Sequence, residues 1–341
     1  MTLTKPVYFF SFASLSILLL VVIDICLGSV YIPVKSILYS ILGTEELKES
    51  WKIILYEIRI PRVLTTLVVG SGLSVSGLIM QSLFRNPLAG PYVLGISSGA
   101  SLGVAITVLA GISLGLSVLD GVVTLLAAML GSGFVFIIIL IAANRVRSSI
   151  SLLIIGLMTA SITGAIVSVL QYFSKAEDIQ LYLLWTFGNL SSTSYQDLKI
   201  LIPLVLGGIF LSWIYMKPLN AYLLGEEYAT TLGINIKVFR RVIIISASII
   251  AGSITAYCGP IAFLGIAVPH LTRLTVQSAN HKILIPASAL FGIILLLVCD
   301  IISQLPGSSY TLPINAVTSL IGAPVIIWVV ISKGKLNRSF A

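Results

Sequence analysis

Long apolar stretches, separated by short polar interruptions, make up almost the whole chain. A stretch of roughly 20 residues, wound as a helix, crosses a hydrocarbon layer about 30 Å thick. The stretches do not alternate between apolar and polar residues, so they predict helices, which satisfy their own backbone hydrogen bonds in lipid, and not barrel strands. The sequence therefore predicts an all-α, polytopic membrane protein. The expected spans are residues 7–28, 63–84, 93–112, 118–142, 149–173, 200–216, 238–257, 260–268, 283–303 and 313–332.

One of these stretches, IAFLGIAVP at 261–269, is shorter than the others. Pro260 and Pro269 bound it, and about ten helical residues rise only about 15 Å, half a bilayer. A half-helix, a buried short helix and a re-entrant segment all fit this length.

Basic residues decide the number of crossings, because Lys and Arg collect in short cytoplasmic loops. With ten crossings and a cytoplasmic N-terminus, 13 of the 20 basic residues face inward. Without the short span, the basic tail at 333–338 would lie outside. We therefore expect about ten transmembrane helices in one domain over 1–341, with both ends in the cytoplasm. The inward basic residues are Lys5, Arg85, Arg145, Arg147, Lys217, Lys237, Arg240, Arg241, Arg273, Lys282, Lys333, Lys335 and Arg338.

Composition agrees with this picture and narrows the class of protein. The 341 residues are 57% hydrophobic and 9% charged, with a mean hydropathy of +1.10, which is too apolar for a water-soluble domain. The net charge of +8 comes from basic residues in separate loops, so it reflects membrane topology and not nucleic-acid binding. Residues 7–28 lack a small-residue cleavage site, so we expect a retained helix and not a signal peptide. Cys26, Cys258 and Cys299 form no C-x-x-C pair and are expected to be packing residues.

Ionisable residues are missing from the centre of every expected span. Asp24, Asp120 and Asp300 lie near span ends, whereas ion-coupled transporters usually carry such groups near mid-membrane. The energy for transport is then expected from elsewhere. The sequence also has no Gly-rich phosphate loop, so we do not expect the chain to bind ATP itself. An ion-coupled secondary transporter remains the alternative function.

A membrane enzyme is the third possibility, and the sequence offers no site for it. His270 and His281 are eleven residues apart on one expected cytoplasmic loop, with no Cys, Asp or Glu beside them to complete a metal site. We interpret both as ordinary loop residues. The sequence predicts no catalytic residues, no metal site and no cofactor.

The polar stretch QSLFRNPLAGP at 81–91 predicts a cytoplasmic turn between the second and third spans. Its prolines end one helix and constrain the next, Asn86 can cap freed backbone groups, and Arg85 holds the turn on the inner side. Before this turn, Gly70 and Ser74 are four residues apart and predict close helix packing in lipid.

A second polar stretch, GPIAFLGIAVPHLTR at 259–273, echoes the first. GPYVLGI (90–96) and GPIAFLGI (259–266) share a Gly-Pro, an apolar pair and a Leu-Gly-Ile. The echo is short, and chance explains it equally well. If it reflects ancestry, spans 2–5 and 7–10 are related halves that run in opposite senses, as in many transporters.

The longest expected cytoplasmic loop, 216–241, contains EEYATTLGIN, which predicts a short helix lying off the membrane at about 222–234. A solvated loop helix would explain this pattern. The spacing of Glu227, Ala229 and Gly233, however, resembles the Glu-Ala-Ala…Gly loop that ABC importer permeases insert into their ATPase subunits.

Four segments together resemble one family, the permeases of type II ABC importers for iron–siderophore complexes, haem and cobalamin. The matching text covers nearly the whole chain in the right order. It runs from RIPRVLTTLVVGSGLSVSGLIMQSLFRNPLAGPYVLGISSGASLG through LGEEYATTLGI and GPIAFLGIAVPHLTR to LPINAVTSLIGAPVIIWVV.

The resemblance implies the type II ABC importer permease fold in a multi-pass protein of a bacterial inner or plasma membrane. It implies a dimer of permease subunits, with a homodimer expected, two cytoplasmic ATPases below and an extracytoplasmic substrate-binding protein above. The segment 222–234 would be the coupling helix. By resemblance, the coupling residues are Glu226, Glu227, Ala229 and Gly233, the binding-protein docking residues are Arg59 and Arg62, and the gate region contains Gln81, Arg85, Asn86, Pro87, Gly90 and Pro91.

One position departs from the family pattern. Family members often carry a third outer arginine shortly after the acid that ends the ninth span, whereas this chain keeps Asp300 and has Gln304 there. We expect weaker docking, or the use of Lys52, and we assign no docking role to Gln304. The sequence does not distinguish a siderophore from haem or cobalamin as the substrate. By resemblance, an iron–siderophore complex is the first expectation, because that is the commonest substrate of the family.

Overall fold

A computed structural model describes residues 4–41, 48–110, 121–146, 148–308 and 310–331 of the protein. The described residues contain helices and no strands, so the all-α prediction is confirmed. Asp120, Arg147 and the basic tail Lys333, Lys335 and Arg338 lie outside the described residues. The helices are α1 (Thr4–Cys26), α2 (Val34–Ile41), α3 (Glu49–Ile53), η1 (Ile54–Arg59), α4 (Ile60–Phe84), η2 (Pro91–Leu94), α5 (Ile96–Ala110), α6 (Gly121–Arg145), α7 (Ser149–Phe173), α8 (Ala176–Thr186), α9 (Tyr195–Ile214), α10 (Met216–Leu223), α11 (Glu226–Thr231), α12 (Ile236–Cys258), α13 (Leu264–Val276), α14 (His281–Ser303) and α15 (Ile314–Ile331).

Each of the ten predicted spans corresponds to a helix. Within the described residues, seven helical segments are long and apolar enough to cross a membrane, and α5 and α15 are shorter apolar helices. The second span is longer than predicted, because α3, the π-helical turn η1 and α4 form one continuous helical segment over Glu49–Phe84. Helices α2, α8 and α10 are additional short elements that the apolar pattern did not predict.

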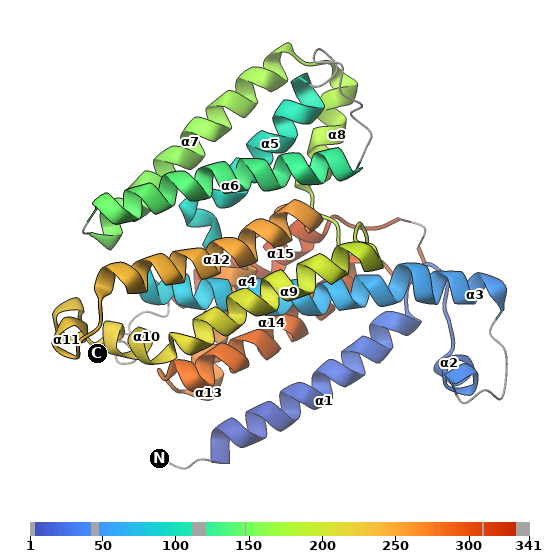
Figure 1. Ribbon diagram of the computed structural model, residues 1–341. Coiled ribbons are helices and arrows are strands. Elements are labelled where there is room, and N and C mark those ends of the chain that lie inside the picture. The colour runs from blue at the N-terminus through green and yellow to red at the C-terminus, as the bar shows by residue number, and fades with distance from the viewer. Residues whose placement is uncertain (1–3, 42–47, 111–120, 147, 309, 332–341) are drawn as a thin grey trace.

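Helix α4 runs through the centre of the bundle, with α9, α12, α13 and α14 around it (Figure 1). Helices α5, α6, α7 and α8 form a second group, which joins the first mainly where α12 meets α6 and α5. Central α4 and α12 are mostly buried, whereas α1, α6 and α7 expose large apolar side chains. The exposed apolar side chains on these outer helices form a surface that can contact lipid or a second membrane subunit.

Small residues let α4 approach its neighbours closely. A Cβ atom on Gly292 of α14 would lie 1.9 Å from the Ser74 hydroxyl and 2.2 Å from the Gly70 carbonyl oxygen. The close packing predicted for Gly70 and Ser74 is therefore confirmed. In the same way, a Cβ atom on Gly77 would lie 1.8 Å from the carbonyl oxygen of Gly265 on α13.

The bounds predicted for the short eighth span are wrong. Helix α13 does not end at Pro269 but contains it, and the helix starts after Phe263, whose φ is +67°. Pro269 has no N–H to donate to the Gly265 carbonyl four residues back. That carbonyl lies against Gly77 of α4, so the proline sits where the helix already makes a backbone contact with its neighbour.

Candidate functional site

The polar turn at 81–91 lies along α13. Gln81 donates a hydrogen bond from Nε2 to the Ile266 carbonyl at 3.1 Å and accepts one at Oε1 from Arg273 at 2.6 Å. His270 Nε2 lies 2.9 Å from the Pro87 carbonyl oxygen, and its imidazole is buried. The interruption in the apolar sequence is therefore a polar seam, in which Gln81 of α4 bonds a backbone carbonyl of α13 and His270 of α13 contacts one of the connecting segment.

The backbone of this turn takes the shape that its sequence suggests. Arg85 ends α4 in the left-handed region, with φ +47°, and Asn86 accepts a hydrogen bond from the Leu88 amide at 3.0 Å. Beyond Pro87, Gly90 approaches Ile266 of α13 so closely that a Cβ atom would lie 2.9 Å from its side chain. Pro91 then starts η2. The gate role of these residues stays a prediction.

The two segments that echo one another in sequence meet in space. The Tyr92 hydroxyl donates to the Ile261 carbonyl and accepts from the Ile261 amide at 3.0 Å. Gly265 lies against Pro91, since a Cβ atom there would lie 2.7 Å from the proline ring. Each segment also leads into a short helix, α5 or α13. The contact between them thus connects two non-helical segments inside the helix bundle.

The predicted short helix after Gly225 corresponds to α11, and Gly233 follows its end. The bounds 222–234 are too wide, because Gly225, with φ +139°, separates α11 from α10. A residue with a side chain rarely adopts this φ, which explains a glycine at the break. Gly233, with φ +82°, ends α11 with open space around its Cα.

The four predicted coupling residues have different environments in the structure. Glu226 forms an ion pair with Arg240 of α12, with 2.8 Å between Oε2 and Nη2. Ala229 is fully buried and seats the helix on the protein, while Glu227 is exposed. The arrangement leaves Glu227, the open turn at Gly233 and the apolar side chains of Leu224 and Leu232 free for a partner.

Neither histidine is the loop residue that we expected. His270 lies inside α13, and His281 is the first residue of α14 with a fully buried side chain. The nitrogens of the His281 ring lie 2.7 Å from the Ser82 hydroxyl and 2.7 Å from Asn220 Oδ1. The sequence did not reveal this cluster, because Ser82 and Asn220 are far from His281 along the chain.

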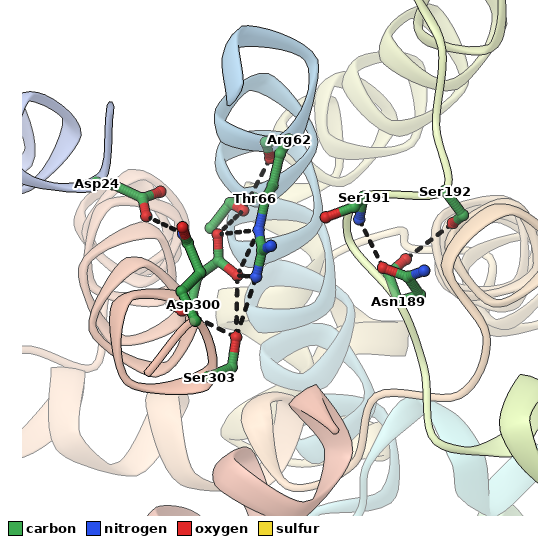
Figure 2. Close-up of polar contacts among 9 residues, drawn as sticks. Asp24, Arg62, Thr66, Asn189, Ser191, Ser192, Asp300 and Ser303 are labelled. Carbon is green, nitrogen blue, oxygen red and sulfur yellow. Dashed lines mark hydrogen bonds and ion pairs between the residues drawn. The ribbon is translucent and has the colours of Figure 1, made fainter. Parts of the chain in front are cut away.

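At the opposite end of the bundle, Arg62 of α4 pairs with buried Asp300 of α14 (Figure 2). The closest contact, from Nη2 to Oδ1, is 2.6 Å, and Nε lies 3.0 Å from both carboxylate oxygens. Two hydroxyls complete the cluster. Thr66 donates to Asp300 Oδ2 at 3.3 Å, and Ser303 accepts from Arg62 Nη2 at 3.1 Å. Charge-assisted bonds of this forked kind fix orientation strongly.

Arg59 is also turned toward the protein. Its guanidinium donates to the carbonyls of Ile25, at 2.5 Å, and Val30, and thereby holds the end of α1 and the following loop. Gln304 donates to Asp24 of α1 at 2.6 Å. The docking role of Arg59 and Arg62 stays a prediction, but in this conformation both side chains have internal partners.

The loop between α8 and α9 covers the outer end of α12. The Asn189 amide donates to the Cys258 carbonyl at 2.8 Å, and the Ser192 hydroxyl donates to the Tyr257 carbonyl at 3.0 Å. Figure 2 shows Asn189, Ser191 and Ser192 of this loop across α4 from Asp300.

Comparison with known proteins defines the class. The model of the FecCD transport family matches residues 16–332, so the chain belongs to this family. It is 36% identical over 326 residues to the vitamin B12 import system permease protein BtuC of Klebsiella pneumoniae subsp. pneumoniae, covering 94% of this chain and 93% of that protein. It is 33% identical to the protein of the same name from Salmonella typhi, covering 94% of each chain.

Solved structures agree with the family. A metal-chelate type ABC transporter in an inward-facing conformation superposes with a TM-score of 0.82 at 27% identity, covering 96% of this chain and 99% of that chain. PsaBC from Streptococcus pneumoniae, solved in complex with Fab, superposes with a TM-score of 0.52 at 19% identity and shows the fold alone. The chain is thus an ABC importer permease of the FecCD type, a transport subunit in the bacterial inner membrane, and its predicted type II permease fold is confirmed.

Proposed function

We propose that this chain forms, as a single domain over 1–341, the translocation subunit of an ATP-driven importer for cobalamin, delivered by an extracytoplasmic binding protein. The observation that supports the ATP-driven mechanism is α11, a short helix held to α12 by the Glu226–Arg240 pair with its other face open. Relatives named as vitamin B12 import permeases support cobalamin as the substrate. An iron chelate, such as a ferric siderophore or haem, is the second candidate because of the metal-chelate type transporter.

The proposed assembly contains two copies of this permease, two cytoplasmic ATPases and one binding protein. Exposed apolar side chains on α7, among them Ile154, Met158 and Ile162, give the permease a membrane-facing surface that a second copy can cover in part. The ATPases would bind at α11 and the binding protein at the end that carries the Arg62–Asp300 pair.

Uptake into proteoliposomes tests this function directly. Vesicles containing this chain and its co-encoded ATPase are given ATP, the co-encoded binding protein and labelled cobalamin, ferric siderophore or haem in parallel. We expect cobalamin uptake that requires both ATP and the binding protein. Uptake of an iron chelate alone would reassign the substrate, and uptake driven by an ion gradient without ATP would overturn the ATP-driven mechanism.

The coupling surface is tested by substitutions on α11. Glu227→Arg reverses an exposed charge, and Gly233→Trp adds bulk to the open turn. We expect the double variant to lose the ATPase on co-purification and to lose most uptake. Gly233→Asn is the matched control, because asparagine tolerates a positive φ and adds little bulk. Normal uptake by the double variant would show that α11 is not the ATPase contact.

Docking at the outer end requires a test that does not leave a buried charge. The double variant Arg62→Gln with Asp300→Asn removes both members of the ion pair together, which avoids the penalty of an unpaired buried charge. If Arg62 docks the binding protein, this variant binds it more weakly while the ATPase still co-purifies. Unchanged affinity would remove Arg62 from the docking surface.

A further inference from the structure

A cavity of about 180 Å³ lies between α6 and α12, near the middle of both helices. This is where the group of α5, α6, α7 and α8 meets the central bundle (Figure 1). The two helices run in opposite directions, so the end of α6 and the start of α12 lie on the same side as α11. An apolar cavity of about 150 Å³ already holds a molecule as large as benzene. The space between α6 and α12 is therefore large enough for part of a ligand.

The wall of this cavity is mainly apolar and includes two glycines. Met129, at the rim, is exposed and Phe136 is half-buried. A Cβ atom on Gly133 of α6 would have nothing within 4 Å, and one on Gly252 of α12 would meet its nearest neighbours at 3.6 Å, an ordinary contact distance. At Gly77, by contrast, a Cβ atom would overlap backbone. The glycines of the cavity thus leave space for another molecule.

Three serines also line the cavity, and two of them bond to their own helices. Ser132 donates to the Met129 carbonyl at 3.0 Å, and Ser253 donates to the Ile249 carbonyl at 2.6 Å. The buried hydroxyl of Ser248 has no hydrogen-bond partner among the described residues. A buried hydroxyl is costly to leave unpaired. Ser248 therefore provides a donor for an oxygen atom of an amphiphilic ligand.

The inner end of the same interface is basic. Arg241 of α12 donates from Nε to Asn144 Oδ1 of α6 at 2.5 Å, and Lys237 lies one turn before it on the same face of α12. Both basic residues are exposed. Arg240 is paired with Glu226, whereas Arg241 contacts a neutral amide. Positive charge at this end is therefore accessible to an anion.

One face of α12 connects the basic end to the cavity. The residues Lys237, Arg241, Ile245, Ser248 and Gly252 follow one another at spacings of three and four, which places them along one side of the helix. Ser248 is seven residues beyond Arg241, a rise of about 10 Å. The basic residues thus lie at the expected inner boundary of the membrane, and the cavity lies deeper in the hydrocarbon layer. A phospholipid has the same order, with its phosphate at the surface and its acyl chains below.

We propose that the α6–α12 interface binds an anionic phospholipid of the inner leaflet, with its phosphate at Lys237 and Arg241 and one acyl chain in the cavity. Lys and Arg next to a membrane span attract anionic headgroups. The chain supplies contact atoms to a wall that would otherwise lose dispersion contacts. The bound lipid contacts both helix groups and so fills the space where they meet. This inference goes beyond the proposed function and does not depend on the transported substrate.

Native mass spectrometry of the full-length permease tests the headgroup site. The protein is exchanged into mild detergent with phosphatidylglycerol or phosphatidylcholine, and the retained lipids are counted. We expect one phosphatidylglycerol per chain, retained roughly tenfold more strongly than phosphatidylcholine, because two basic residues attract its net charge. Lys237→Gln with Arg241→Gln should abolish this preference. Arg145→Gln is the control, because Arg145 is exposed at the same end of α6 but lies about 100° around the helix from Asn144.

Bulky substitutions test the acyl-chain site. Gly133→Phe and Gly252→Leu fill the cavity from its two sides, and each should lower retention of both lipids severalfold. Gly207→Phe is the matched control, because a Cβ atom there also has nothing within 4 Å and Gly207 does not line the cavity. A ligand that binds only the folded state raises its stability. Phosphatidylglycerol should therefore raise the thermal midpoint of the unsubstituted and Gly207→Phe proteins, but not that of Gly133→Phe.

Three results would overturn the proposal. The headgroup site is wrong if the unsubstituted permease retains both lipids equally, or if the Lys237 and Arg241 double variant keeps the preference. The acyl-chain site is wrong if Gly133→Phe and Gly252→Leu retain as much lipid as Gly207→Phe; should Gly133→Phe not fold, Gly252→Leu decides. Release of the lipid by excess inorganic phosphate would show that the interface binds an anion alone. Transport is not measured in any of these experiments, so their failure would leave the proposed function intact.

Discussion

At the scale of single residues, the ion pair between Arg62 and Asp300 fixes the outer end of α4 against α14. The Asp300 side chain is fully buried and that of Arg62 is 15% exposed. Removing one partner of such a buried pair leaves the other charge without its hydrogen-bonded counter-ion, which typically costs about 3–5 kcal/mol. We therefore expect Asp300→Ala to lower the free energy of unfolding by about this amount, measured by thermal unfolding of the purified permease in detergent.

A surface pair of the same chemistry provides the control. Glu49 lies 3.7 Å from Lys52 and its side chain is 82% exposed. Exposed ion pairs contribute about 0–1 kcal/mol, so Glu49→Ala should change stability very little. Equal effects of Asp300→Ala and Glu49→Ala would show that the Arg62–Asp300 pair does not hold the outer end together.

The same residues show what the sequence could and could not predict. The apolar pattern placed Arg59, Arg62 and Asp300 near the outer membrane boundary. It could not show that the arginines turn inward, because their partners are determined by packing between helices that are far apart in sequence. The buried positions of His270 and His281 escaped prediction for the same reason, since their hydrogen-bond partners lie on other elements.

At the scale of elements, contact between α4 and α13 depends on two glycines. A Cβ atom on Gly77 would overlap the Gly265 carbonyl oxygen at 1.8 Å. This neighbour is backbone and cannot swing aside, so Gly77→Ala must separate the two helices. Overpacking of this kind costs about 1–3 kcal/mol, and we expect a lower thermal midpoint together with weaker uptake, because the polar seam at 81–91 lies on α13.

Gly207 of α9 is the matched control for Gly77. It is also helical, but a Cβ atom there would have nothing within 4 Å. Gly207→Ala should be neutral or slightly stabilising, because alanine favours helix by up to about 1 kcal/mol. A Gly77→Ala protein as stable as the Gly207→Ala protein would mean that α4 and α13 do not pack through this glycine pair.

Helices were the most predictable elements, and the breaks within them the least. Hydrophobic runs located a helix for each of the ten expected spans, and the longer ones were the easiest because lipid demands about 20 apolar residues for each crossing. The start of α13 at Leu264 and the division at Gly225 depend instead on single backbone conformations. A proline inside α13 misled the prediction, since the structure keeps the helix and places the affected carbonyl against α4.

At the scale of the whole molecule, the distribution of basic residues predicts which end of the bundle faces the cytoplasm. Helices α10 and α11 lie at one end, and α2 and α3 lie at the other (Figure 1). Lys237, at the start of α12, is on the expected inner side, and Tyr310, between α14 and α15, is on the expected outer side. Both residues are exposed, so each can be replaced by cysteine and labelled.

We expect a membrane-impermeant maleimide to label Tyr310→Cys in spheroplasts and to label Lys237→Cys only after the membrane is opened. The native cysteines, Cys26, Cys258 and Cys299, are all buried, so the unsubstituted chain should stay unlabelled and serves as the control. The reverse pattern would place α11 outside, where no cytoplasmic ATPase could reach it. ATP-driven transport by this permease therefore requires that α11 faces the cytoplasm, because only there can it bind the ATPase, and the basic residues of the inner loops give the chain this orientation.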